Sequence, residues 1–167
     1  MDEPILRPGT ARDVPELVET VRQGFETYRA WAPRGWEPPE RELHVSGVRG
    51  RLAEPGSWCE VAEAGGQIAG QVGTVPARGA PHAAHIWMLF LREPWWGTGL
   101  AARLLARADA AAIAAGQAEL RLQTPSEHAR ARAFYEREGF ERRGEPLYEP
   151  MLGLVLVSYR RRARATD

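Results

Sequence analysis

The sequence Pro94-Trp95-Trp96-Gly97-Thr98-Gly99-Leu100-Ala101-Ala102 carries the clearest structural signal in this chain of 167 residues. The apolar run 86–91 before it is typical of a buried strand, and the Ala-, Leu- and Arg-rich run 100–115 after it is typical of a helix. Glycine lets a ligand approach the main chain closely. The first N–H groups of a helix lack intrahelical partners and carry the positive end of its dipole. The sequence therefore predicts an anion-binding turn, with a phosphate-bearing molecule as its ligand.

Composition indicates one domain over residues 1–167, without a nucleic-acid or membrane partner. The 22 Lys and Arg residues balance the 22 Asp and Glu residues, which argues against nucleic acid as the main partner. No apolar run reaches the ~20 residues that span a bilayer, and the first residues lack the features of a signal peptide. The single cysteine, Cys59, excludes an intrachain disulfide and a thiolate cluster. We therefore expect a cytoplasmic protein without a metal site.

Hydrophobic periodicity and turn residues predict the element order β-α-α-β-β-β-α-β-α-β-β, without repeats or linkers. Gly65-Gly66, between two strand-like runs, is typical of a tight hairpin turn. The expected strands are 5–7, 58–64, 67–75, 82–91, 120–124, 140–143 and 152–160. The expected helices are 14–25, 40–53, 99–115 and 127–138, the first capped by Thr10 or Asp13. The basic segment at about 160–167 is expected to be a solvated tail.

A dinucleotide is one alternative ligand for the turn, because Gly97-x-Gly99-x-x-Ala102 satisfies the pattern G-x-G-x-x-G/A. In dinucleotide-binding folds this turn usually follows the first strand, and an acidic residue about 20 positions later binds the ribose. Here three strands and two helices come first, and the next strand ends in Gln123 and Thr124. This order disfavours a dinucleotide, and the Gly-Lys-Ser/Thr of a Walker A loop is absent. A glycine turn without a chemical role is the remaining alternative.

Two segments resemble the motifs of the GNAT-type N-acetyltransferases. The run 89–101, from Leu89 through Trp96 to Ala101, resembles the family's acetyl-CoA motif, an L-x-V strand followed by R/Q-x-x-G-x-G/A at the start of a helix. The run 128–140 resembles the second motif, N-x-x-A-x-x-F/L-Y-x-x-x-G-F. The opening residues 6–13 and the order of elements also match the family, along essentially the whole chain.

This resemblance implies a single α/β (α+β) domain with a mixed, largely antiparallel seven-stranded sheet, four helices and acetyl-CoA as cofactor. The fourth and fifth strands are expected to diverge and admit the pantetheine arm. Trp96 stands where the family has Arg or Gln, and His128 where it often has Asn. Arg92 and Arg103 are candidates for the missing charge, and both equally fit ordinary surface positions. The residues expected to bind the cofactor are Leu89, Phe90, Leu91, Trp96, Gly97, Thr98, Gly99, Leu100, Ala101, His128 and Phe134.

Acetyl transfer to an amine needs an oxyanion donor, a proton donor for the leaving sulfur and a base. The resemblance implies a strand bulge around Phe90–Leu91 that frees a main-chain N–H, and Tyr135 as the acid. An alkyl ammonium with a pKa of ~10.4 is only about 0.1% neutral at pH 7.4, so a base is needed. His85 is the first candidate, and a half-buried histidine bonded to backbone is its alternative role. Further base candidates are Glu60, Glu63 and His82.

The acceptor is predicted to be a primary amine of a small molecule or peptide, acetylated directly in a ternary complex. Tyr135 also fits a purely structural role in aromatic packing. The alternative function is a GNAT-fold sensor or interaction module that binds CoA without turnover. The family often forms homodimers, and the fold does not identify the acceptor. The candidates for the acceptor pocket are Trp31, Trp36, Trp58 and Glu60.

Overall fold

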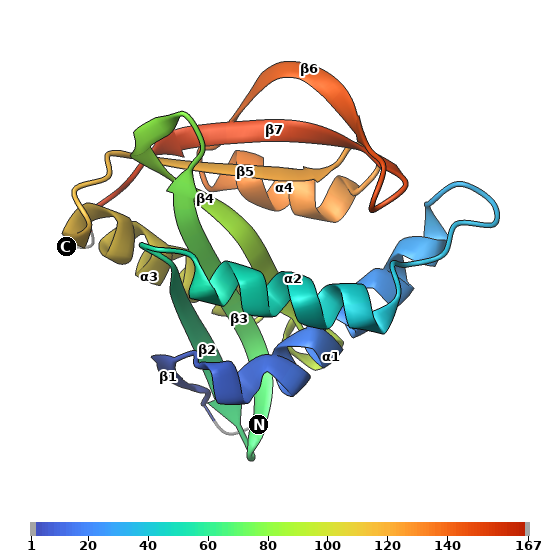
Figure 1. Ribbon diagram of the computed structural model, residues 1–167, viewed down its shortest axis with the longest axis horizontal. Coiled ribbons are helices and arrows are strands. Elements are labelled where there is room, and N and C mark those ends of the chain that lie inside the picture. Colours follow the sequence, from blue (N-terminus) through green and yellow to red (C-terminus); the bar gives the residue numbers. More distant parts are fainter. Residues whose placement is uncertain (1–2, 166–167) are drawn as a thin grey trace.

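The computed structural model describes residues 3–165, which form a seven-stranded sheet with helices on both faces (Figure 1). The strands are β1 (Ile5–Pro8), β2 (Trp58–Ala64), β3 (Gln67–Ala77), β4 (Ala80–Leu91), β5 (Glu119–Pro125), β6 (Glu141–Glu149) and β7 (Leu154–Arg162). The helices are α1 (Val14–Glu26), α2 (Arg41–Ala53), α3 (Leu100–Ala114) and α4 (Ala129–Arg137), with short 3-10 turns η1 (Ala11–Asp13), η2 (Thr27–Ala30) and η3 (Glu93–Trp95). The order β1-β2-β3-β4-β5-β7-β6 is antiparallel except between β4 and β5. The predicted fold class and element order are confirmed.

Two hydrophobic cores lie on opposite faces of this sheet. Val61 of β2 packs in the core that α1 and α2 cover, whereas its neighbour Ala62 packs in the core of α3 and α4, because successive side chains of a strand alternate between faces. Leu17 of α1 and Leu104 of α3 are both fully buried. In Figure 1, α1 and α2 lie in front of β2 and β3, and α4 lies behind β5. The α1–α2 pair and the start of α3 therefore approach β4 from different sides.

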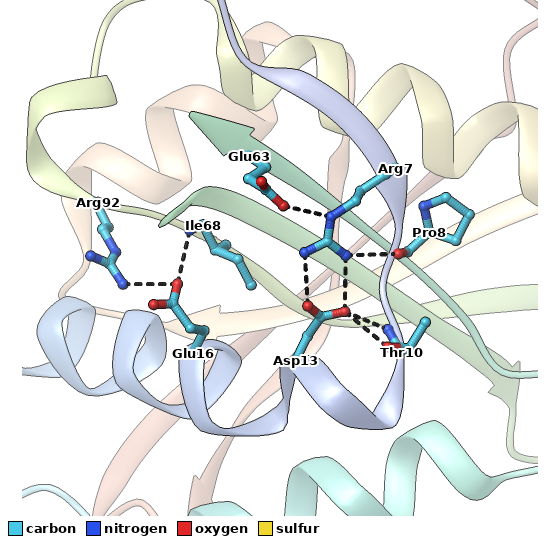
Figure 2. Close-up of polar contacts among 8 residues, drawn as sticks. All are labelled: Arg7, Pro8, Thr10, Asp13, Glu16, Glu63, Ile68 and Arg92. Atoms are coloured by element: carbon cyan, nitrogen blue, oxygen red, sulfur yellow. Dashed lines mark hydrogen bonds and ion pairs between the residues drawn. The ribbon is translucent and has the colours of Figure 1, made fainter. Parts of the chain in front are cut away.

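An ion-paired cluster joins β1 to the start of α1 and to β2 (Figure 2). Arg7 of β1 donates from Nη2 to Asp13 at 2.8 Å and from Nε to Glu63 of β2 at 2.7 Å. Asp13 also accepts from the backbone N–H of Thr10 at 2.8 Å, and the Arg7 guanidinium holds the pKa of the Asp13 carboxyl below its usual value. This cluster anchors α1 and occupies Glu63, one of the candidate bases.

β4 and β5 separate partway along their length (Figure 1). Parallel pairing joins residues 83–86 to 119–122, while β4 continues to Leu91 and β5 to Pro125. Backbone N–H groups alternate in direction along a strand, so those of 87–91 that point toward β5 have no strand partner there. The expected divergence of these strands is present.

The bulge predicted around Phe90–Leu91 is misplaced, because the register between β3 and β4 shifts at Trp87 instead. Gly73 pairs with Met88 and Thr74 pairs with Ile86, which leaves Trp87 without an opposing residue. A Cβ at Gly73 would lie 2.9 Å from the Trp87 ring. The missing side chain at Gly73 therefore makes room for the ring at the bulge.

The largest error in the predicted elements concerns β6, expected at 140–143 and observed at Glu141–Glu149. This edge strand is exposed along nearly its whole length and shows no hydrophobic alternation. Gly144 and Pro146 are residues typical of turns, and they hide the strand in the sequence. Pairing with β7 reveals it, with Leu147 opposite Leu156 after a register shift.

The basic C-terminal segment is partly built into the sheet. Residues 160–162 of the expected tail end β7, where both terminal nitrogens of buried Arg161 donate to Asp109 of α3 at 2.8 Å. The backbone N–H of Arg164 donates to the same carboxylate at 3.0 Å. This segment therefore ties α3 to β7, and residues 166–167 of the expected tail lie outside the described residues.

Residues 3–165 contain neither a membrane-spanning helix nor a group of three clustered His, Cys, Asp or Glu side chains. No helix in this range is long and apolar enough to cross a membrane. The same residues contain no group of three His, Cys, Asp or Glu side chains that could hold a metal ion. Burial raises the pKa of the Cys59 thiol to about 12, so this thiol stays protonated at neutral pH and is a poor nucleophile.

Candidate active site

A cavity of about 980 Å³ lies at the opening between β4 and β5. The diverging strands line it through Trp87–Leu91 and Gln123–Pro125. At one end, called the cofactor side, it is lined by the turn before α3 and by α4. At the other end, called the acceptor side, it is lined by α1 and α2. Its volume suits an organic cofactor together with a small partner molecule.

The glycine turn on the cofactor side has the geometry of an anion cradle. Gly97 and Gly99 adopt φ angles of +74° and +86°, and a Cβ at either position would meet no heavy atom within 4 Å. The first helical hydrogen bond runs from Arg103 N–H to Gly99 C=O at 3.1 Å. Within the described chain, the N–H groups of residues 97–102 make no backbone hydrogen bond. Free amides, an open face and the positive end of α3 fit a phosphate group.

The expected cofactor residues divide between side chains and main chain. Thr98 and Leu100 do not line the cavity with their side chains, because Thr98 Oγ1 donates to Trp95 C=O at 2.8 Å and Leu100 is buried in the core beneath α3. Their N–H groups are among those without a backbone partner. The expected residues that line the cavity are Leu89, Phe90, Leu91, Trp96, Gly97, Gly99, Ala101, His128 and Phe134.

Trp96 is held in the cavity wall and supports an arginine. Its Nε1–H donates to Leu91 C=O at 3.0 Å. The guanidinium carbon of Arg130, from the first turn of α4, lies 3.2 Å from the centre of the Trp96 ring. Arg130 also lines the cavity. Sequence reasoning missed Arg130, although it lies only two residues after His128 in the second motif.

The two arginines predicted as sources of cofactor charge are used elsewhere. Arg92 donates to Gln67 at 3.1 Å and contacts Glu16 at 3.4 Å, as Figure 2 shows for Glu16. Arg103 pairs with Glu3 at 3.4 Å. Neither arginine lines the cavity. Both are held away from the cradle because each has a carboxylate partner outside the cavity.

Tyr135 of α4 combines the two roles considered for it from the sequence. Its ring packs against Phe140 and Tyr159, with ring centroids 5.7 and 6.3 Å away. The residue also lines the cavity, and its hydroxyl makes no hydrogen bond within residues 3–165. Burial raises the pKa of the Tyr135 phenol above its ordinary value. The hydroxyl is therefore protonated throughout the neutral range and available as a donor.

Tyr28 of η2 is a second buried phenol in the same cavity, and no motif in the sequence singles it out. Burial raises its pKa, and the nearby Tyr135 adds to the shift. Its ring lies 4.6 Å from Trp31 and 5.0 Å from His128, measured between ring centroids. Tyr28 therefore links α1 and the segment before α2 to the start of α4.

Of the four candidate bases, only His85 lines the cavity. Buried Glu60 accepts from Arg107 of α3 at 2.7 Å, so it is occupied away from the cavity on the α3 face. His82 is exposed, and Glu63 belongs to the Arg7 cluster. Burial and, secondarily, Arg51 lower the pKa of His85 to about 4. His85 is therefore neutral at pH 7, but it is a weak base toward an ammonium group with a pKa of ~10.4.

The buried, neutral state of His85 predicts acid-sensitive folding. The pKa of its imidazole is about 4 in the folded state against the ordinary 6.5. Between these values the unfolded state binds the extra proton, so His85 stabilises the fold above pH 6.5 and loses this contribution as pH falls toward 4. For His85→Gln, which cannot titrate, we expect the loss of unfolding free energy between pH 7 and pH 4 to be about 3 kcal/mol smaller than for the wild type.

Urea unfolding at pH 7, 5.5 and 4 would measure this slope. His82→Gln is the matched control, because His82 is exposed on the same strand. Equal pH slopes for His85→Gln and the wild type would show that His85 is not held in the neutral form.

The tryptophans predicted for the acceptor pocket lie behind its wall instead of lining it. Trp36 Nε1–H donates to Leu152 C=O at 2.8 Å, and Trp31 stacks on Tyr28. Trp58 packs against the core of α3, and Glu60 faces Arg107. The sequence cannot distinguish aromatic residues that line the pocket from aromatic residues that pack behind them. The side chains that line the acceptor side include Phe25, Leu43, His44, Arg51, Trp87 and Leu152.

Comparison with known proteins agrees with this geometry. The sequence profile of the acetyltransferase (GNAT) family matches residues 21–140, most of the chain. A GNAT-family protein from Desulfovibrio desulfuricans has 18% identity and a TM-score of 0.76, covering 96% of this chain and 99% of its own. An acetyltransferase from Thermus thermophilus has 22% identity and a TM-score of 0.75, covering 96% and 97%.

The yncA protein from Salmonella typhimurium, solved with its cofactor acetyl-CoA, has 15% identity and a TM-score of 0.70, covering 99% of this chain and 97% of its own. At such identities these structures show a shared fold. Comparison with curated proteins gave no match. The fold and the profile together define the class, an acetyltransferase. This chain belongs to the acetyltransferase (GNAT) family, whose cofactor is acetyl-CoA.

Proposed function

We propose that this protein transfers the acetyl group of acetyl-CoA to a primary amine by direct transfer in a ternary complex. The observation that carries the proposal is a single cavity that joins the glycine cradle, Tyr135 and the aromatic acceptor side through the opening between β4 and β5. The cradle supplies unpaired amides for phosphate, and the opening accommodates an extended arm. The residues present therefore fit acetyl-CoA.

Bound acetyl-CoA supplies a thioester whose carbonyl carbon forms the new C–N bond while its C–S bond breaks. Main-chain N–H groups of β4 that face the opening stabilise the negative charge on the carbonyl oxygen. Tyr135 donates its proton to the departing sulfur, for which its protonated phenol is suited. An acceptor that enters as an ammonium loses two protons: one goes to solvent before the attack, and the other restores the Tyr135 phenol after its proton has gone to the sulfur.

His85 contributes to the acceptor side in this proposal, in a role modified from the predicted base. Its pKa of about 4 lies far below that of an alkyl ammonium, so it is a poor direct acceptor of the amine proton. A neutral imidazole still accepts a hydrogen bond. We propose that His85 orients the attacking amine and that water carries the proton away.

The acceptor side favours an amine with an apolar or aromatic body. Phe25, Leu43 and Trp87 line it, and Gly24 lets Phe90 close against α1, where a Cβ would lie 2.6 Å from the Phe90 ring. The acceptor remains proposed as a small-molecule or peptide amine. The single domain over 1–167, the cytoplasmic location and a homodimer also remain predictions.

Acetyl-CoA binding is tested by thermal unfolding. A ligand that binds only the native state at a hundredfold excess over Kd stabilises it by about 2.7 kcal/mol, so we expect the Tm to rise by roughly 5–10 °C. ATP at the same concentration is the control, because it provides a nucleotide without pantetheine.

A thiol-release assay with a panel of amines then tests turnover. We expect CoA release to depend on the amine and to be fastest for amines with apolar bodies. A Tm shift without amine-dependent thiol release would support the alternative of a CoA-binding module. No shift at millimolar acetyl-CoA would refute both functions.

A further inference from the structure

Arg130 is a cation without a counter-ion at the mouth of the anion cradle. Its guanidinium lies over the Trp96 ring at 3.2 Å, and both residues line the cavity with Gly97 and Gly99. Of the other two arginines that line the cavity, Arg51 pairs with Glu54, and Arg137 lies 5.6 Å from the centre of the Phe134 ring without an ion pair among the described residues. Within residues 3–165 Arg130 forms no ion pair and donates no side-chain hydrogen bond. Its five donors are therefore free for a ligand.

The Arg130 side chain is exposed to solvent at the cavity, so a ligand can reach it. Partial burial lowers its pKa, and the nearby Tyr28 and Glu93 only partly offset this. A cation stacked on tryptophan gains attraction from the ring face, but this contact leaves its N–H groups at the edge unused. An oxygen-rich anion in the cradle would satisfy those groups, in the planar two-point geometry that arginine forms with phosphate.

The position of Arg130 is fixed from two directions. Trp96 is anchored by its hydrogen bond to Leu91 C=O, so the ring under the guanidinium is held against the end of β4. The start of α4 is anchored by His128, whose ring lies 5.0 Å from Tyr28 and 5.2 Å from Trp31. Arg130 therefore spans from α4 toward the turn before α3, across the mouth of the cavity.

We propose that Arg130, held on the Trp96 ring, binds the diphosphate of acetyl-CoA together with the free amides of residues 97–102. This inference rests on the proposed function and adds a cofactor-binding residue from another helix. Trp96 then serves as a platform for a charge that arrives from α4, instead of supplying a polar side chain itself. The arrangement makes cofactor affinity depend on the packing of α4 against the turn.

Titration calorimetry with CoA and with 3′-dephospho-CoA tests this assignment, since both contain the diphosphate. Loss of hydrogen bonds to a charged group costs about ten- to hundredfold in affinity. We expect Arg130→Gln to weaken both ligands by this factor equally. Arg103→Gln is the matched control, because Arg103 is an arginine near the turn that pairs with Glu3 outside the cavity.

The double variant Trp96→Arg/Arg130→Gln sharpens the test, because it moves the arginine from α4 to the turn before α3 and so restores a positive charge there. We expect it to recover most of the lost affinity, while Trp96→Leu alone weakens both ligands by removing the platform. Unchanged affinity in Arg130→Gln would overturn the proposal, as would a loss seen with CoA but not with 3′-dephospho-CoA, which would assign Arg130 to the 3′-phosphate. Failure of the wild type to bind CoA would instead overturn the proposed function.

Discussion

Gly99→Val is expected to abolish acetyl-CoA binding, with at least a hundredfold loss of affinity, while the protein stays folded. Two effects combine at this position. The φ angle of +86° belongs to the left-handed region, which costs a residue with a Cβ roughly 1–2 kcal/mol. The added side chain also projects into open space where Gly99 lines the cavity, so it would occupy the proposed phosphate site. Titration calorimetry with acetyl-CoA measures the loss.

Gly116→Val is the matched control for this variant. Gly116 follows the other end of α3, has a φ angle of +74° and also faces open space, but it does not line the cavity. Both variants should therefore lose a similar amount of thermal stability, and only Gly99→Val should lose binding. Equal acetyl-CoA affinity in the two variants would contradict the cradle.

Tyr135→Phe is expected to lower kcat by about a hundredfold or more, the usual contribution of a general acid, with little change in acetyl-CoA affinity. The ring packs against Phe140, and phenylalanine preserves this contact, so the fold should persist. Only the hydroxyl that reaches the cavity is removed. Steady-state thiol release gives kcat, and the acetyl-CoA-dependent Tm shift gives an independent measure of binding.

Two further tyrosine-to-phenylalanine variants are needed to interpret the kcat of Tyr135→Phe. Tyr159→Phe is the control, because the Tyr159 hydroxyl donates to Glu136 at 2.8 Å and the residue does not line the cavity. Tyr28→Phe tests the rival donor, since Tyr28 is a second buried phenol of the cavity. Full activity in Tyr135→Phe would show that Tyr135 has only a structural role in aromatic packing. A larger loss of kcat in Tyr28→Phe would instead identify Tyr28 as the general acid.

Local patterns predicted those parts of the fold that depend on neighbouring residues. Val14, Leu17 and Val18 follow the i, i+3, i+4 spacing of a helix face in α1, and all three are buried. Gly65-Gly66 marks a hairpin, and the turn at Gly97–Gly99 has the positive φ angles that its composition requires. In contrast, β6 was underestimated because an exposed edge strand has no hydrophobic periodicity and exists through backbone bonds to β7.

The site shows the same division. Gly97, Gly99 and Tyr135 were predicted from the sequence because each belongs to a short segment with a specific pattern, and all three line the cavity. Glu60 was placed in the acceptor pocket, but its strand neighbours do not reveal that Arg107 lies above it. Trp31 and Trp36 were predicted for the acceptor pocket, but they pack on Tyr28 and do not line the cavity.

Sequence alone was sufficient for the order of elements, the glycine turn and the family resemblance, since these follow from residue spacing along one segment. Packing between distant segments determined which polar groups are free. It paired Arg92 and Arg103 with carboxylates and left Arg130 on the ring of Trp96. Burial likewise set the pKa of His85. The ion-pair partners of a side chain and its burial depend on which segments meet in three dimensions. Neither can be predicted from residue spacing along the chain.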